Sequence, residues 1–146
     1  MENIQRGFMK AEGATFQGDS THPKFKGQMV VLDVAFGVSQ LGGHDKNATP
    51  TPQATEVSVR KYLGASSPEL AQACALKTPL TKVVITLPDL SEMTFESCHI
   101  KSAHPSLNVE EDHPTEVVTL SWRKLKWTYG KDPKGTGEID LDKHHK

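Results

Sequence analysis

The sequence predicts a mainly β domain that carries one α-helix. Several segments alternate apolar and polar residues with a period of two, and one further segment has helix-terminus signals instead. The chain has 146 residues, of which 36% are hydrophobic and 24% charged, which is ordinary for a globular domain with one core. We therefore expect one domain, a barrel or a sandwich, across residues 1–146.

The first two predicted strands are separated by a polar loop. Residues 7–12 are typical of a short strand, and residues 13–27, with three glycines and a proline, of a loop. Residues 29–38 show the clearest alternation. One face of this strand is expected to be core, and the smaller, charged face to meet solvent, a neighbouring subunit or an enclosed space. The expected core face is Val30, Leu32, Val34, Phe36 and Val38, and the other is Met29, Val31, Asp33, Ala35 and Gly37.

A long loop is predicted next. Residues 39–53 hold Gly42-Gly43, Pro50 and Pro52 among small polar residues, which disfavours both a helix and a central strand. A connection of this length is usually functional, so we expect a mobile segment that is ordered by contact with something else. Residues 54–63 then alternate again and predict a third strand, with one face formed by Val57, Val59, Lys61 and Leu63.

One helix is predicted over residues 67–77. Ser67 suits the N-cap, Pro68 suits the first helical position, and Glu69 complements the helix dipole. Lys77 and Pro79 indicate its end. The flank expected to cover an open side of the barrel or sandwich consists of Leu70, Ala73, Cys74 and Leu76.

Three more strands are predicted at residues 80–87, 92–103 and 115–129. The last has a fault in its pattern, because Val118, Leu120 and Trp122 share one parity and Leu125, Trp127 and Tyr129 the other. If all six side chains enter one core, an extra residue near Arg123-Lys124 must form a β-bulge, or the strand must bend from one sheet to another. The alternative is a strand with both faces partly covered.

Charge and hydropathy argue against several partner classes. The net charge is −1 and the basic residues are scattered, so we expect neither a nucleic-acid face nor a membrane surface. The apolar runs are far shorter than a membrane span, and the first ten residues lack a classical export signal. We expect synthesis in the cytoplasm, with any export performed by a separate machine. Cys74 and Cys98 are expected to be reduced and buried.

The residues that could carry chemistry form no dense motif. Cys98-His99 with His104 comes nearest to a metal-ligand cluster, but adjacent strand residues point to opposite faces. A cysteine nucleophile, Cys74 or Cys98 with a distant histidine, stays open, although no oxyanion-loop pattern accompanies it. The acidic run 110–112 is typical of a solvated turn. We expect no catalytic residue, no metal and no cofactor.

Three segments, in their order and spacing, resemble the haemolysin-coregulated protein (Hcp) family, the tube subunits of bacterial type VI secretion. They are VLDVAFGVSQ at 31–40, RKYLGASSPELAQACA at 60–75 and VTLSWRKLKWTY at 118–129. The most specific part is a strand followed by a short connection and a Ser-Pro-x-Leu helix with Ala-Cys after it. The resemblance covers roughly residues 7–141, and the remaining C-terminal residues are expected to form a flexible tail.

The resemblance implies a small closed β-barrel of two sheets with one flanking helix, assembled into hexameric rings that stack into a tube. It implies partners: further copies of the chain, secreted effector proteins in the lumen, and the type VI sheath and tip proteins, with export that needs no signal peptide. It suggests that Asp33 and Ala35 face the lumen. It also suggests a ring-stacking loop formed by Gly42, Gly43, His44, Asp45, Lys46 and Asn47. The alternative is a divergent secreted effector or enzyme that uses the same barrel without forming a tube.

Overall fold

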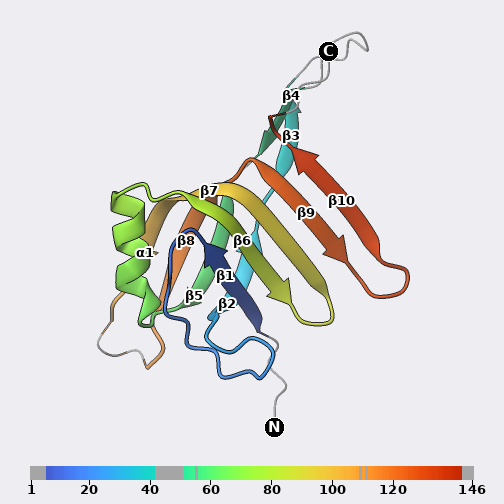
Figure 1. Cartoon of the computed structure of the whole chain (residues 1–146). Coiled ribbons are helices and arrows are strands. Elements are labelled where there is room, and N and C mark those ends of the chain that lie inside the picture. The colour runs from blue at the N-terminus through green and yellow to red at the C-terminus, as the bar shows by residue number, and fades with distance from the viewer. Residues whose placement is uncertain (1–5, 42–50, 55, 109, 111, 143–146) are drawn as a thin grey trace.

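The computed structural model describes residues 6–41, 51–54, 56–108, 110 and 112–142 (Figure 1). Within these residues it confirms the predicted mainly β class with one flanking helix, α1 (Ser66–Ala75). The strands are β1 (Gly7–Glu12), β2 (Met29–Ala35), β3 (Val38–Leu41), β4 (Thr51–Ala54), β5 (Val57–Tyr62), β6 (Leu80–Leu87), β7 (Ser91–Pro105), β8 (Thr115–Ser121), β9 (Lys124–Tyr129) and β10 (Gly135–Asp140).

A closed barrel forms the centre of the molecule. Its strands follow the order β7, β6, β1, β2, β5 and β8, and β8 pairs back onto β7. The long β7 makes closure possible, because its first half lies between β6 and β9 while its second half pairs with β8. Two ribbons extend away from the barrel in Figure 1, the β9–β10 pair and the separate β3–β4 sheet.

The core fills the barrel. Phe95 on β7 is fully buried, and its ring meets Phe36 and Trp122 edge-on at centroid distances of 5.7 and 5.6 Å. Helix α1 packs beside β7 and buries Leu70 and Ala73 (Figure 1). In the part of the chain that the structure describes, no helix has the length and hydropathy needed to cross a bilayer.

The predicted faces of the second strand are wrong over its first half. Met29 and Val31 are the buried residues, while Val30 and Leu32 are partly exposed. The register between β2 and β5 shifts between Val31 and Asp33, which inserts one extra residue, and this reverses the inward parity. Beyond the bulge Val34 and Phe36 do pack against the core, as predicted. The strand ends at Ala35, and Val38 begins β3 and is exposed.

The loop predicted at residues 39–53 is shorter than expected. Its two ends form the antiparallel ribbon β3–β4, in which Gln40 lies opposite Pro52. A proline is tolerated here because the described part of this ribbon has only two strands, so the missing amide can face an open edge. The middle of the loop lies outside the described residues.

The helix begins one residue before its predicted cap. Ala65 occupies the N-cap position without a side-chain hydrogen bond, so the expectation for Ser67 is wrong. The Ser67 hydroxyl instead accepts the N–H of Gly64 at 3.0 Å and bonds to the carboxylate of Glu116. The prediction that Leu76 belongs to the buried flank of the helix is also wrong. Leu76 lies at the C-cap and is 69% exposed.

The predicted strand at 115–129 is broken at Trp122 and Arg123 into β8 and β9, which follow the same edge of β7. The break lies where the sequence analysis placed the change of parity, and Trp122 and Leu125 on its two sides are both buried. The condition that all six large side chains enter one core is wrong, because Trp127 and Tyr129 are 41% and 54% exposed. Both lie on the ribbon that leaves the barrel. Strand β10 was not predicted at all, since its glycines gave no strand signal.

Candidate lumen face and contact surfaces

Four neighbouring strands of the barrel share one outer face. Cross-strand partners place it in two rows that run from β2 across β5 and β8 to the second half of β7. We call this surface the outer face. One row is Asp33, Arg60, Val117 and His104, and the other is Ala35, Ser58, Thr119 and Ser102. The structure thus brings Asp33 and Ala35, the two predicted lumen residues, onto one surface, where both are exposed.

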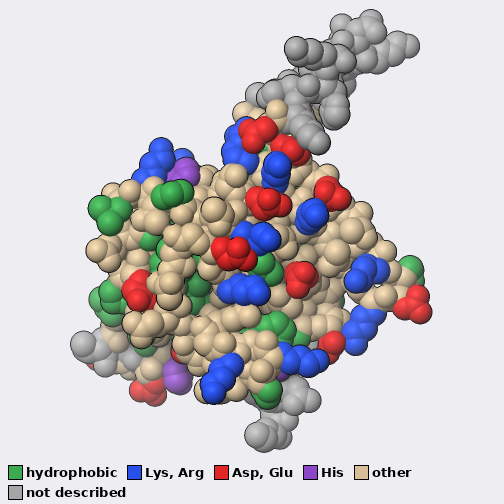
Figure 2. All heavy atoms as spheres, viewed as in Figure 1, with side chains coloured by type: hydrophobic (Ala, Val, Ile, Leu, Met, Phe, Trp, Pro, Cys, Tyr) green, Lys and Arg blue, Asp and Glu red, His purple; other side chains and the backbone are tan. Residues whose placement is uncertain are grey.

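The outer face is mostly polar, with Val117 and Ala35 as its apolar members, and its charges include one ion pair. Arg60 Nε donates to Asp33 Oδ2 at 2.6 Å, so the charge of Asp33 on β2 is compensated by the exposed cation of β5. In the second row the hydroxyls of Ser102 and Thr119 are hydrogen-bonded at 2.5 Å, and the side chains are small. Such a surface can lie against a polypeptide without a fixed chemical specificity. The viewed face in Figure 2 likewise shows basic and acidic side chains interspersed.

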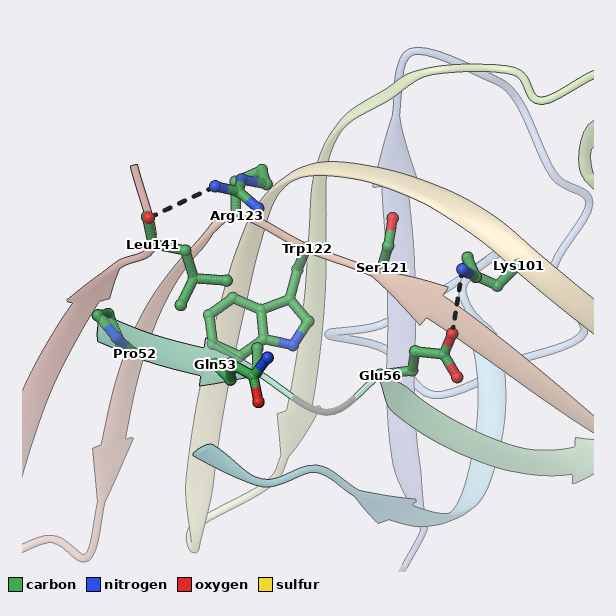
Figure 3. Close-up of a pocket in the computed structure, with 9 residues that line it drawn as sticks. Pro52, Gln53, Glu56, Lys101, Ser121, Trp122, Arg123 and Leu141 are labelled. Carbon is green, nitrogen blue, oxygen red and sulfur yellow. Dashed lines mark hydrogen bonds and ion pairs between the residues drawn. The ribbon is translucent and has the colours of Figure 1, made fainter. Parts of the chain in front are cut away.

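The predicted ring-stacking residues, from Gly42 to Asn47, lie outside the described residues. The ribbon that carries them is described at its base, where a cavity of about 510 Å³ opens (Figure 3). Its floor is the buried Trp122, and Pro52 and Gln53 of β4 lie on one side. Two contacts join residues that line it, the Lys101–Glu56 ion pair at 3.5 Å and an Arg123 hydrogen bond to the Leu141 carbonyl at 3.4 Å.

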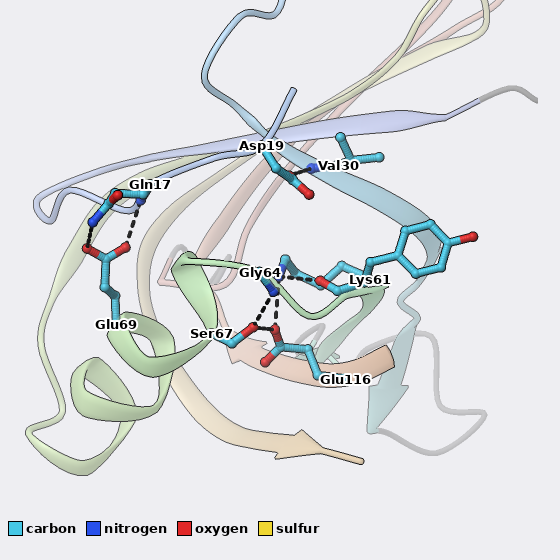
Figure 4. A network of polar contacts seen from close by, with 9 residues as sticks. Gln17, Asp19, Val30, Lys61, Gly64, Ser67, Glu69 and Glu116 are labelled. Carbon is cyan, nitrogen blue, oxygen red and sulfur yellow. Dashed lines mark hydrogen bonds and ion pairs between the residues drawn. The ribbon is translucent and has the colours of Figure 1, made fainter. Parts of the chain in front are cut away.

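A buried polar network joins the barrel to the helix (Figure 4). Lys61 of β5 and Glu116 of β8 are both 1% exposed, and Lys61 Nζ donates to Glu116 Oε2 at 2.9 Å and to the Tyr62 carbonyl at 2.8 Å. Lys61 shares the inward face of β5 with Val57 and Val59, the residues with which the sequence pattern grouped it. Its partner, Glu116, was not predicted. The sequence signal for its burial is that Glu116 has the same strand parity as the buried Val118 and Leu120.

Within the described residues, the cysteines and histidines do not gather into a reactive centre. Cys98 is buried and Cys74 half-buried, so the expectation holds for Cys98 and is too strong for Cys74. Burial and the charge of Glu96 raise the pKa of Cys98 from 9.0 to about 12. His99 lies beside the Ser121 hydroxyl at 2.8 Å, and burial with the charges of Lys77 and Lys101 lowers its pKa. Among the described residues no group of three acidic, histidine or cysteine side chains could hold a metal ion.

The raised pKa of Cys98 predicts how the two cysteines react with an alkylating reagent. At pH 8 the folded chain should label at Cys74, and Cys98 should stay unmodified because only about one Cys98 in ten thousand is a thiolate. Peptide mass spectrometry after iodoacetamide treatment measures this, with the urea-unfolded chain, labelled at both positions, as the control. Rapid labelling of folded Cys98 would contradict the burial.

Because folding raises the pKa of Cys98, the contribution of this thiol to stability is present below pH 9 and declines as the pH rises toward 12.

Comparison with known proteins places this barrel in a class. A sequence model described as "Type VI secretion system effector, Hcp" matches residues 8–129. Among solved structures, Hcp1 from Salmonella typhimurium is 20% identical with a TM-score of 0.80, covering 97% of this chain and 99% of that one. A type VI secretion system effector from Yersinia pestis is 19% identical with a TM-score of 0.77, covering 92% and 98%. Secreted protein Hcp3 from Pseudomonas aeruginosa is 19% identical with a TM-score of 0.65, covering 95% and 99%.

At these identities the structural likeness establishes the fold, and the fold with the family match defines a type VI secretion tube-like protein. The chain belongs to the Hcp family, since the family model spans most of its length. This confirms the resemblance found in the sequence. The family consists of secreted structural tube proteins and is not known for enzymatic activity. The comparison with curated proteins gives no match.

Proposed function

We propose that this chain is a structural subunit of the type VI inner tube, which forms hexameric rings that stack and carry or chaperone secreted effector proteins. The observation that carries the proposal is the family match over residues 8–129. The barrel geometry supports it, because four neighbouring strands of the closed barrel form one outer face that could line a lumen. In this proposal Asp33 and Ala35 face the cargo, and the loop from Gly42 to Asn47 contacts the next ring.

The remaining partners follow from the tube. Sheath and tip proteins would surround and cap it, and the chain would leave the cell through the secretion apparatus without a signal peptide. Negative-stain electron microscopy of the purified protein tests the proposal. We expect rings with a central channel, single or stacked. A field of single small particles would favour the alternative, an Hcp-like effector or enzyme that does not form a tube.

A substitution at Ala35 tests the lumen assignment separately. Ala35→Arg should leave the ring intact, because the side chain is exposed on the outer face. It should weaken retention of a co-expressed effector about tenfold or more, since each subunit would add a bulky cation to the lumen wall. Native mass spectrometry checks the ring, and co-purification with the effector checks the cargo. Leu76→Arg, at the exposed helix end, is the control. Dissociation of the ring by Ala35→Arg would place Ala35 in a subunit interface instead.

A further inference from the structure

The β9–β10 ribbon has two unlike faces. On one, charges of opposite sign lie opposite each other, Lys124 against Asp140 at 3.8 Å and Lys126 against Glu138. On the other, every cross-strand pair is apolar or contains a glycine. These pairs are Leu125 with Ile139, Trp127 with Gly137 and Tyr129 with Gly135. An antiparallel ribbon with this alternation normally buries its apolar face.

The apolar face of the ribbon continues out of the core and is then left uncovered. Exposure rises along β9, from 1% at Leu125 to 41% at Trp127 and 54% at Tyr129. Phe36 covers one edge of the Trp127 ring at a centroid distance of 5.3 Å, next to a groove of about 520 Å³. Farther out, Trp127 and Tyr129 border a second hollow of about 290 Å³ over the two glycines.

The two glycines are not required by this chain. Gly130, in the turn before them, has a φ of +86° and so needs to be glycine, whereas Gly135 and Gly137 have no such backbone. A Cβ on Gly137 would meet nothing within 4 Å, and one on Gly135 only the Tyr129 carbonyl at 3.8 Å. Glycine inside a strand lowers stability, and where the chain itself does not need it, it often marks close approach of another backbone.

We propose that the apolar face of the β9–β10 ribbon is covered by a second copy of this chain, whose backbone approaches over Gly135 and Gly137. This inference rests on the proposed ring. Exposed aromatic rings on a secreted protein need a cover that stays in place. A neighbouring subunit of the ring stays bound, whereas a cargo protein leaves. In addition, no strand of the described residues pairs with the outer edge of β10, so the ribbon also offers free backbone groups. Each copy in a ring would present the same face and have it covered once.

Filling the glycine hollow tests the inference without disturbing the fold. Gly137→Val and Gly135→Val add side chains into open space on an ordinary strand backbone, so the monomer should keep or gain thermal stability. Assembly should weaken at least about tenfold in the midpoint concentration measured by mass photometry and sedimentation velocity. Gly64→Val is the matched control, because its Cβ would meet only the Asp19 carboxylate, at 3.7 Å, away from the ribbon.

The outcomes separate this inference from the proposed function. Weakened assembly in both ribbon variants, with normal assembly of Gly64→Val, supports the contact. Assembly unchanged in both ribbon variants overturns the inference while the ring stands, and it would assign the face to another partner. A wild-type chain that stays monomeric at every concentration overturns both.

Discussion

Glu116→Leu should lower the free energy of unfolding by about 3–5 kcal/mol, because it leaves the ammonium group of Lys61 buried without its carboxylate. The substitution also removes the partner of the Ser67 hydroxyl at the start of α1. Urea unfolding followed by circular dichroism measures the loss. The effect should be large because water cannot reach Lys61 to replace the lost interaction.

Two further variants separate charge burial from packing. Lys61→Met combined with Glu116→Leu should recover most of the stability, since an apolar pair of similar size removes both buried charges. Glu56→Gln breaks the exposed ion pair with Lys101 and should cost less than about 1 kcal/mol. If Glu116→Leu alone proved as stable as the wild type, the ion pair would not be buried as described.

Phe95→Ala should cost about 3–5 kcal/mol, because this fully buried ring contacts aromatic rings from two other segments. The cavity would open between Phe36 and Trp122, where the barrel meets the start of the β9–β10 ribbon. Thermal unfolding measured by calorimetry gives the loss. Leu76→Ala, at a side chain that is 69% exposed, is the control and should change stability by less than about 0.5 kcal/mol. A small effect of Phe95→Ala would mean that the barrel interior repacks freely.

Strand positions were largely predictable from the sequence, because a period of two survives wherever one face is buried. The bounds of β1 and β6 agree with the prediction, and the alternation predicted for residues 54–63 is present in β5. Side-chain direction was less predictable. The bulge that follows Val31 reverses the parity of β2, and apolar residues on both sides of the strand hide it in the sequence.

The ribbons were predicted poorly for a different reason. Strand β10 carries Gly135 and Gly137, and β4 carries Pro52, residues that oppose strand formation in any local reading. Pairing with β9 and β3 overrides that preference. The exposure of Trp127 could not be predicted either, since an aromatic residue in an alternating strand is usually core, and here the strand has already left the barrel.

The candidate lumen face was also predictable only in part. The sequence resemblance selected Asp33 and Ala35, and the structure adds that they belong to an outer face shared by four strands. Only cross-strand register could show that Ala35 lies in a row with Ser58, Thr119 and Ser102.

The mass of the purified chain in solution tests the tube proposal most directly. Light scattering coupled to size exclusion should give one discrete assembly of about 96 kDa, six copies of the 16.0 kDa chain, or stacks of it. A single species at the mass of one chain, unchanged up to high concentration, would contradict the account.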